Sequence, residues 1–232
     1  MKTLGIIGGI APESTIEYYR LIIASYRKQK QDGSYPNIII NSIDMKKMLD
    51  LIGANDLAGV TGYLLSEVKK LALAGADVGL LASNTPHIVF EEINRQSPIP
   101  LISIVEAACE TVKALKLQRI GLFGTRFTMQ GNFYPKVFSR EGITLVVPNM
   151  EEQTFIHDKY MNELVNGIFL PETSTRILYI VDRLIEMEGI KGLILGGTEL
   201  PLLLRDKTYK GIPFFDTTKI HGEQAVAQFI AE

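Results

Sequence analysis

An internal repeat constrains the fold of this chain more than any other feature of its sequence. TLGIIGGIAPEST, which begins at Thr3, aligns with RIGLFGTRFTMQG, which begins at Arg119. At nearly the same offset, GADVGLLASNTP from Gly75 aligns with GIKGLILGGTEL from Gly189. A sequence built twice on one plan predicts two similar lobes. Because small ligands bind preferentially between such lobes, we expect one ligand cleft between them.

The distribution of apolar residues predicts an α/β fold. Short apolar runs, typical of strands buried on both faces, alternate with segments in which apolar residues recur every three or four positions, as in helices. Such alternation predicts two similar Rossmann-like lobes with parallel sheets, related by a pseudo-twofold axis. The predicted strands are residues 3–7, 37–40, 78–81, 101–104, 120–123, 144–147 and 192–195. The predicted helices are residues 14–29, 57–74, 105–115, 132–140, 151–167 and 173–189.

Composition excludes several classes of partner. The chain has 232 residues with 24 basic and 26 acidic side chains and a net charge of −2, so we expect neither a nucleic-acid nor a membrane-surface partner. No run approaches the roughly 18 apolar residues of a membrane span. Cys109 is the only cysteine, which excludes an intramolecular disulfide and a cysteine-based metal cluster and agrees with a cytoplasmic location. We therefore expect a small neutral or acidic metabolite as the ligand.

Several motifs occur in an order that carries a family resemblance. They are GIIGGIAPEST, EYYRLI, NSIDMKKM, GTRFTM and FDTTKIHGEQAV, together with the two repeated strand ends. In this order and spacing the sequence resembles the aspartate/glutamate racemase superfamily. In that family the first-half strand ends in Cys-Asn-Thr and the second-half strand in Gly-Cys-Thr-Glu. The matching segments here are Ser83-Asn84-Thr85 and Gly196-Gly197-Thr198-Glu199, so both catalytic cysteine positions are substituted.

The resemblance implies an organisation and an activity. It implies cofactor-independent racemisation of an acidic amino acid, without a metal, by a homodimer. The tail FDTTKIHGEQAVAQFI resembles the family's helix that returns to the first lobe. We therefore expect a first lobe of residues 1–97 plus 209–232 and a second lobe of residues 98–208. The GIIGG turn lacks the full dinucleotide fingerprint, so the residues favour no nicotinamide cofactor either.

The two substituted positions bear directly on the chemistry. Racemisation without a cofactor requires one base on each face of the α-carbon. A cysteine pKa, ordinarily about 8.5, can be lowered by its surroundings until a useful fraction is thiolate. A serine hydroxyl ionises usefully only when another base takes its proton, and glycine has no side chain. Ser83 is thus either an assisted base or a hydrogen-bonding donor, and we favour the donor; Gly197 cannot be a base.

Other residues at the strand ends retain binding capacity. Asn84, Thr85 and Thr198 each follow a strand and are predicted to open a helix, where backbone N–H groups face an anion such as an α-carboxylate. Gly9 and Thr125 hold equivalent places in the two repeats, and glycine there permits close approach of a ligand. Read one at a time these are ordinary caps and turns, but their mirrored positions favour binding. The predicted substrate-binding residues are Gly9, Asn84, Thr85, Thr125, Gly197 and Thr198.

Further side chains have a structural interpretation, and some of them a functional one as well. Glu199 either supplies a catalytic base, recognises an ammonium group or caps a helix. His87 is more often a packing residue at such a position, and His221 is expected to link the lobes. Arg126, Lys46 and Lys47 either reach a distal carboxylate or belong to a solvated surface. Cys109 is predicted to be a small buried hydrophobe.

Three functions remain open on this reading. The first is a racemase of acidic amino acids that uses atypical bases such as Ser83, Glu199 or His87. The second is a catalytically silent protein that binds an acidic amino acid or another dicarboxylate. The third is a lyase or decarboxylase of the same fold, for which a single proton donor suffices. The family favours the first function, whereas the residues at positions 83 and 197 favour the second.

Overall fold

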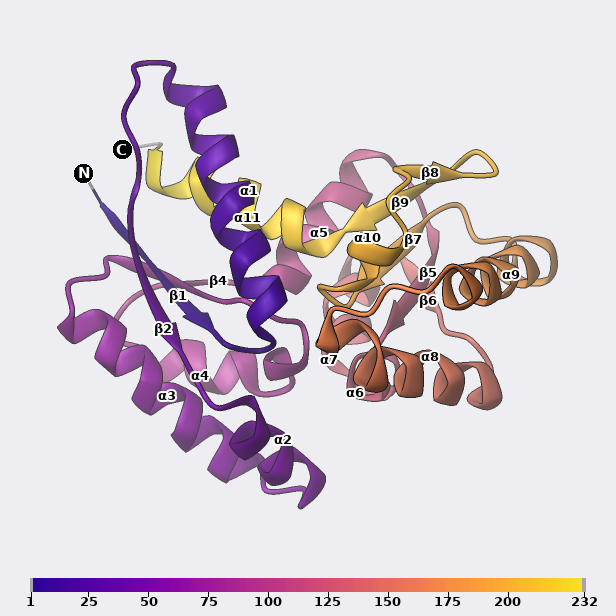
Figure 1. Ribbon diagram of the computed structural model, residues 1–232, viewed down its shortest axis with the longest axis horizontal. Helices are drawn as coiled ribbons and strands as arrows, with labels where there is room; N and C mark the ends of the chain where they lie inside the picture. The colour runs from indigo at the N-terminus through magenta and orange to yellow at the C-terminus, as the bar shows by residue number, and fades with distance from the viewer. Residues whose placement is uncertain (1, 231–232) are drawn as a thin grey trace. The chain divides into compact units, whose positions relative to one another are not determined.

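The computed structural model describes residues 2–230 and shows two compact units (Figure 1). The first unit comprises Met1–Ile104 with His221–Glu232, and the second comprises Val105–Ile220. Residue 1 and residues 231–232, which belong to the predicted first lobe, lie outside the described part. Each unit contains one sheet of mainly parallel strands with helices packed against it, so the fold is α/β, as predicted.

The first unit has a four-stranded parallel sheet in the order β2-β1-β3-β4. Residues of alternate positions in β1 and β3 pack with Tyr18, Ile22 and Tyr26 of α1 and with Val226 and Phe229 of α11 in one core. In Figure 1, α1 and α11 cover one face of this sheet, and α3 and α4 lie on the other side. The strands are β1 (Thr3–Gly8), β2 (Asn37–Ser42), β3 (Val78–Leu81) and β4 (Leu101–Ile102). The helices are α1 (Pro12–Lys30), α2 (Met45–Gly53), α3 (Leu57–Leu73), η1 (Thr85–Val89), α4 (Phe90–Gln96) and α11 (Thr217–Ile230), whose first residues belong to the second unit.

The second unit has a five-stranded sheet in the order β6-β5-β7-β9-β8, in which only β8 runs antiparallel. Its core joins Leu193 and Leu195 of β7 to Ile156 and Tyr160 of α8 and to Ile180 of α9. The strands are β5 (Arg119–Gly124), β6 (Thr144–Val146), β7 (Leu193–Gly196), β8 (Thr208–Tyr209) and β9 (Ile212–Asp216). The helices are α5 (Ile104–Ala114), α6 (Arg126–Gln130), α7 (Phe133–Phe138), η2 (Ser139–Glu141), α8 (Met150–Asn162), η3 (Leu164–Asn166), α9 (Pro171–Glu188) and α10 (Leu200–Leu203).

The internal repeat is preserved in the strand order and in the register of each sheet. In both units the first strand lies between the second and the third, and the neighbour of the third on its other side is β4 in the first unit and β9 in the second. Gly5 pairs with Gly79 in the first unit, and their counterparts in the repeat, Gly121 and Leu193, pair in the second. The repeated sequence therefore specifies one pairing scheme twice.

The structure corrects three predictions about these elements. The edge strands β2 and β6 are largely half-buried or exposed, because an edge strand is covered less completely than a central one. β8 and β9 were not predicted; they form a hairpin around Lys210 and Gly211, which both have positive φ, as a two-residue turn of this kind requires. β4 pairs in the first sheet and β9 in the second. The chain therefore passes from one unit to the other at 104/105 and 220/221, and not at the predicted 97/98 and 208/209.

Candidate functional site

The first strand-end cluster, defined as Ser83, Asn84 and Thr85, follows the carboxyl end of β3. All three residues are buried. Ala82 N–H donates to the Ile7 carbonyl of β1 at 2.9 Å, which ties this end to the neighbouring strand. The chain then turns into the short 3-10 helix η1, whose N-cap residue is Asn84. The sheet therefore fixes where this cluster begins.

His87 lies against the first cluster but is not placed to act as a base. Its Nδ1–H donates to the Ser83 carbonyl oxygen at 3.0 Å, so its Nε2 is the nitrogen that accepts from Ile104 N–H at 3.2 Å. Burial, reinforced by nearby His221, lowers the pKa of His87 to about 3. The imidazole is neutral near pH 7 and both of its nitrogens are occupied. These two hydrogen bonds hold the Ser83 backbone in place, and neither of them involves the Ser83 hydroxyl.

His221 performs a similar structural role within the first unit. Its Nε2–H donates to the Ile102 carbonyl at 2.9 Å, and its Nδ1 accepts from the Tyr18 hydroxyl at 2.8 Å. Burial lowers the pKa of His221 to about 4. These bonds join α11 to β4 and α1 of the same unit, whereas we had expected His221 to link the lobes.

Gly9 is needed by the backbone of the protein itself. Its φ is +82°, and a Cβ there would lie 2.5 Å from the Ile43 carbonyl oxygen and 2.7 Å from Ser42 Oγ. Gly9 N–H donates to Thr15 Oγ1 at 2.8 Å. The glycine therefore lets the segment after β2 pass close to the turn after β1, which accounts for it without a ligand.

The second strand-end cluster, defined as Gly197, Thr198 and Glu199, follows the carboxyl end of β7. Leu200 N–H donates to the Gly197 carbonyl at 3.0 Å, and the helix α10 that follows has only four residues. Thr198 and Glu199 are each 1% exposed. Full burial of a carboxylic acid side chain is rare unless hydrogen bonds satisfy it, so the partners of Glu199 decide its role.

Glu199 is held by two hydroxyl groups. Its Oε2 accepts a short hydrogen bond from the Tyr160 hydroxyl and a 2.9 Å hydrogen bond from Thr198 Oγ1. Burial and the adjacent negative charge raise the pKa of Tyr160 well above its usual value, so the phenol keeps its proton. Glu199 is the N-cap residue of α10, but its side chain makes no capping hydrogen bond there. Its bond to Tyr160 instead anchors α8 to the end of β7, a role that was not predicted. Tyr160 was not predicted, because on α8 it resembles any other apolar-period core residue.

The space beside Gly197 is filled by the ring of Tyr160. A Cβ built on Gly197 would lie 3.0 Å from Tyr160 Cζ and 3.1 Å from its hydroxyl oxygen, and closer still to Cε2. The φ of Gly197 is outside the left-handed region. A side chain at position 197 is therefore obstructed by a neighbouring ring and not by the conformation of the backbone.

The remaining predicted residues have structural or surface roles. Thr125 is the N-cap of α6, and its Oγ1 accepts from Thr128 N–H at 3.4 Å. Arg126 is exposed at the start of that helix. Lys46 pairs with Asp50 at 2.6 Å, and Lys47 Nζ lies 4.5 Å from the centroid of the Tyr63 ring.

Cys109 is buried in α5, as predicted, and burial raises its thiol pKa to about 11. Such a thiol is inert near neutral pH. Across residues 2–230, no group of three or more histidine, cysteine or acidic side chains is arranged to hold a metal ion. Among the same residues, no helix has the length and apolar character needed to cross a membrane.

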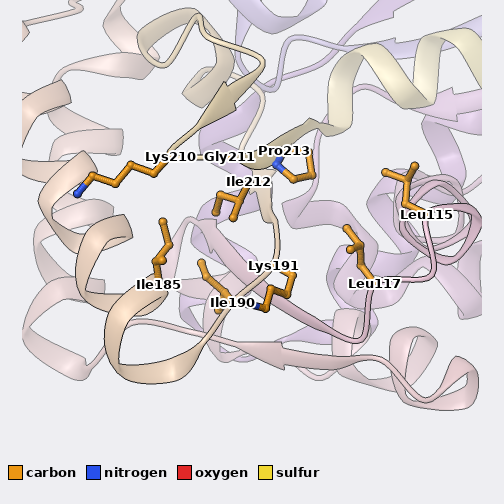
Figure 2. Close-up of a pocket in the computed structure, with 9 residues that line it drawn as sticks. All are labelled: Leu115, Leu117, Ile185, Ile190, Lys191, Lys210, Gly211, Ile212 and Pro213. Carbon is orange, nitrogen blue, oxygen red and sulfur yellow. The ribbon is translucent and has the colours of Figure 1, made fainter.

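A surface pocket of about 580 Å³ lies at the other end of the second sheet (Figure 2). Leu117 precedes β5, Lys191 precedes β7 and Ile212 begins β9, so the pocket adjoins the amino ends of these strands. The second cluster follows a carboxyl end. The pocket is therefore separate from the candidate site.

Comparison with known proteins assigns the family. A model of the Asp/Glu/hydantoin racemase family matches residues 7–225. The chain belongs to this family. It is 25% identical to the broad-specificity amino-acid racemase RacX of Bacillus subtilis (strain 168) over 98% of both chains.

Solved structures agree with the family and the fold. An aspartate racemase homologue from Pyrococcus horikoshii OT3 is 34% identical over the whole of both chains, with a TM-score of 0.82. The aspartate racemase of Picrophilus torridus is 20% identical, with a TM-score of 0.77 over all of this chain and 95% of the other, and supports the fold alone.

Proposed function

We propose that this racemase-family protein binds an acidic amino acid at a strand-end cluster and does not racemise it by the two-thiol route. One observation carries the proposal. Apart from Ser83, each residue predicted as a replacement base is buried and makes hydrogen bonds within the protein. His87 binds Ser83 O and Ile104 N, and Glu199 binds the Tyr160 and Thr198 hydroxyls. Gly197 offers no side chain. Only Ser83 is left among the proposed bases.

Ser83 is a weak candidate for a base. Its hydroxyl needs a neighbour to remove its proton, and the nearest predicted helper, His87, points Nδ1 at the Ser83 carbonyl oxygen. With one face of a substrate carbon served at best, interconversion of enantiomers has no complete path. The hydroxyl instead suits a hydrogen bond to the ligand.

The ligand class follows from the family and from the cluster chemistry. Relatives of this chain are described as aspartate racemase homologues and as an amino-acid racemase. Asn84 and Thr85 supply short polar side chains beside backbone N–H groups at a strand end, which suits carboxylate binding. Thr198 can offer only its backbone N–H, because its hydroxyl donates to Glu199. We propose in addition that the protein is a cytoplasmic homodimer that needs no cofactor.

Thermal melting tests the binding proposal. A ligand that binds only the folded protein adds about 2.7 kcal/mol at a hundred times its dissociation constant. Aspartate or glutamate should raise the melting temperature, and alanine should raise it less. Equal shifts with all three, or no shift, would contradict an acidic-ligand site.

Chiral chromatography tests the proposed lack of racemisation. Pure L-aspartate or L-glutamate incubated with the protein should keep its configuration. Efficient conversion would show that Ser83, His87 or Glu199 acts as a base after all. Measuring carbon dioxide and ammonia in the same samples would detect a decarboxylase or lyase.

A further inference from the structure

Thr218 carries a buried hydroxyl that the protein leaves without a partner. It stands in the first turn of α11, directly after β9, and is 1% exposed. Within the described residues, its Oγ1 is closed to solvent and has no hydrogen-bond partner. Buried hydroxyl groups are nearly always hydrogen-bonded, because leaving one unpaired costs free energy. This hydroxyl therefore calls for an explanation.

Neighbouring groups in the same turn are satisfied by the protein. The Thr217 hydroxyl donates to the Leu195 carbonyl of β7 at 2.8 Å. Asp216 Oδ1 accepts from Lys219 N–H at 3.0 Å, which caps the helix. The unpaired hydroxyl of Thr218 is thus a local exception in a well-bonded helix start.

The position of Thr218 relates it to the second cluster. β7 and β9 are parallel neighbours, and their last paired residues are Leu195 and Asp216. The second cluster and Thr218 each follow shortly after one of these residues, so they belong to the same edge of the sheet. The carboxyl ends of parallel strands are where open α/β sheets bind ligands. α11 has 14 residues, and its N-terminus favours negative charge.

We infer that Thr218 is a ligand-binding residue of this strand end, with its hydroxyl donating to a carboxylate oxygen of the bound amino acid. The inference rests on the proposed function and adds a residue to that site. Because Oγ1 is closed to solvent, binding requires the first turn of α11 to move locally. The hydroxyl then gains the partner that the folded chain does not give it.

Thr218→Val tests the inference, because valine keeps the shape of threonine and removes the hydroxyl. Without ligand, the variant should melt at the wild-type temperature or above it, since no hydrogen bond within the protein is lost. Its affinity for aspartate or glutamate, measured by titration calorimetry, should fall roughly tenfold or more. Thr217→Val is the matched control: it should lower the melting temperature, because it breaks the bond to Leu195.

The outcomes separate this inference from the proposed function. If wild-type protein binds neither amino acid, the proposed function fails and this inference fails with it. If wild-type binds and Thr218→Val binds equally well, only the role of Thr218 is overturned. A large loss of stability in ligand-free Thr218→Val would also overturn it, since the hydroxyl would then have a structural partner.

Discussion

The Tyr160 ring occupies the space into which a side chain at Gly197 would project. The phenol carbon Cζ and the hydroxyl oxygen would lie 3.0 Å and 3.1 Å from a Cβ at that position. The same hydroxyl donates to Glu199, so the ring is held in place by a buried carboxylate. The space that a side chain at position 197 would need is therefore occupied by the ring of Tyr160 from α8.

Gly197→Ala should lower the melting temperature by several degrees, because the added methyl group overlaps the Tyr160 ring and overpacking of a core costs about 1–3 kcal/mol. Gly62→Ala is the control, since a Cβ there meets nothing within 4 Å and alanine favours a helix. Tyr160→Ala should be destabilising alone, yet adding Gly197→Ala to it should cost little more. Additive losses in this double-mutant cycle would contradict the overlap.

Installing the two thiols should require removal of the ring. Ser83→Cys alone should give at most one-sided exchange of the substrate α-proton with deuterium, because only one face of the carbon is served. Gly197→Cys should be tolerated only together with Tyr160→Ala. The triple variant should then interconvert aspartate enantiomers slowly, as followed by chiral chromatography and NMR. A folded, ligand-binding triple variant without any exchange would refute the assignment of positions 83 and 197 to the catalytic places.

Tyr160→Phe should destabilise the protein by about 1–3 kcal/mol, because Glu199 loses one hydrogen bond while it stays buried. Denaturant unfolding measures the change. Tyr179→Phe provides the comparison, since Tyr179 is 61% exposed and its hydroxyl removal should be nearly neutral. Equal stability of the two variants would mean that the Tyr160 hydroxyl contributes nothing to the anchoring of α8.

Acid should destabilise the first unit through its two buried histidines. Unfolded histidine has a pKa near 6.5, whereas His87 and His221 have pKa values of about 3 and 4. Between pH 6.5 and 4.5 the unfolded chain takes up protons that the folded chain does not, so stability falls as pH falls, by up to about 1.4 kcal/mol per pH unit for each histidine.

The slope of the unfolding free energy against pH in this window tests that expectation. His221→Gln should remove about half of the slope, even if it lowers stability at every pH. His157→Gln should leave most of it, because His157 is only half-buried. A wild-type stability that stays flat between pH 6.5 and 5 would rule out neutral buried histidines.

Sequence alone determined the repeated plan of the chain. Apolar runs and helix-period segments located most strands and helices, because burial between two layers leaves a periodic mark on each segment. The repeat also identified which residues follow equivalent strands. The family resemblance, and not the repeat, predicts that Ser83 and Gly197 stand where the family keeps thiols. These features are local or are copied within the chain, so they can be read from it directly.

Only the tertiary structure decided what surrounds those positions. Periodicity shows that Tyr160 faces a core, but the packing of α8 on the second sheet places its ring against Gly197. The neutral state of His87 depends on its burial and on nearby His221, and the unpaired hydroxyl of Thr218 depends on every group around it. The pairing of β9 with β7 in the second sheet was likewise decided by the tertiary structure. Contacts between segments distant in sequence are set by the packing of whole elements, and that packing leaves no local pattern in the sequence.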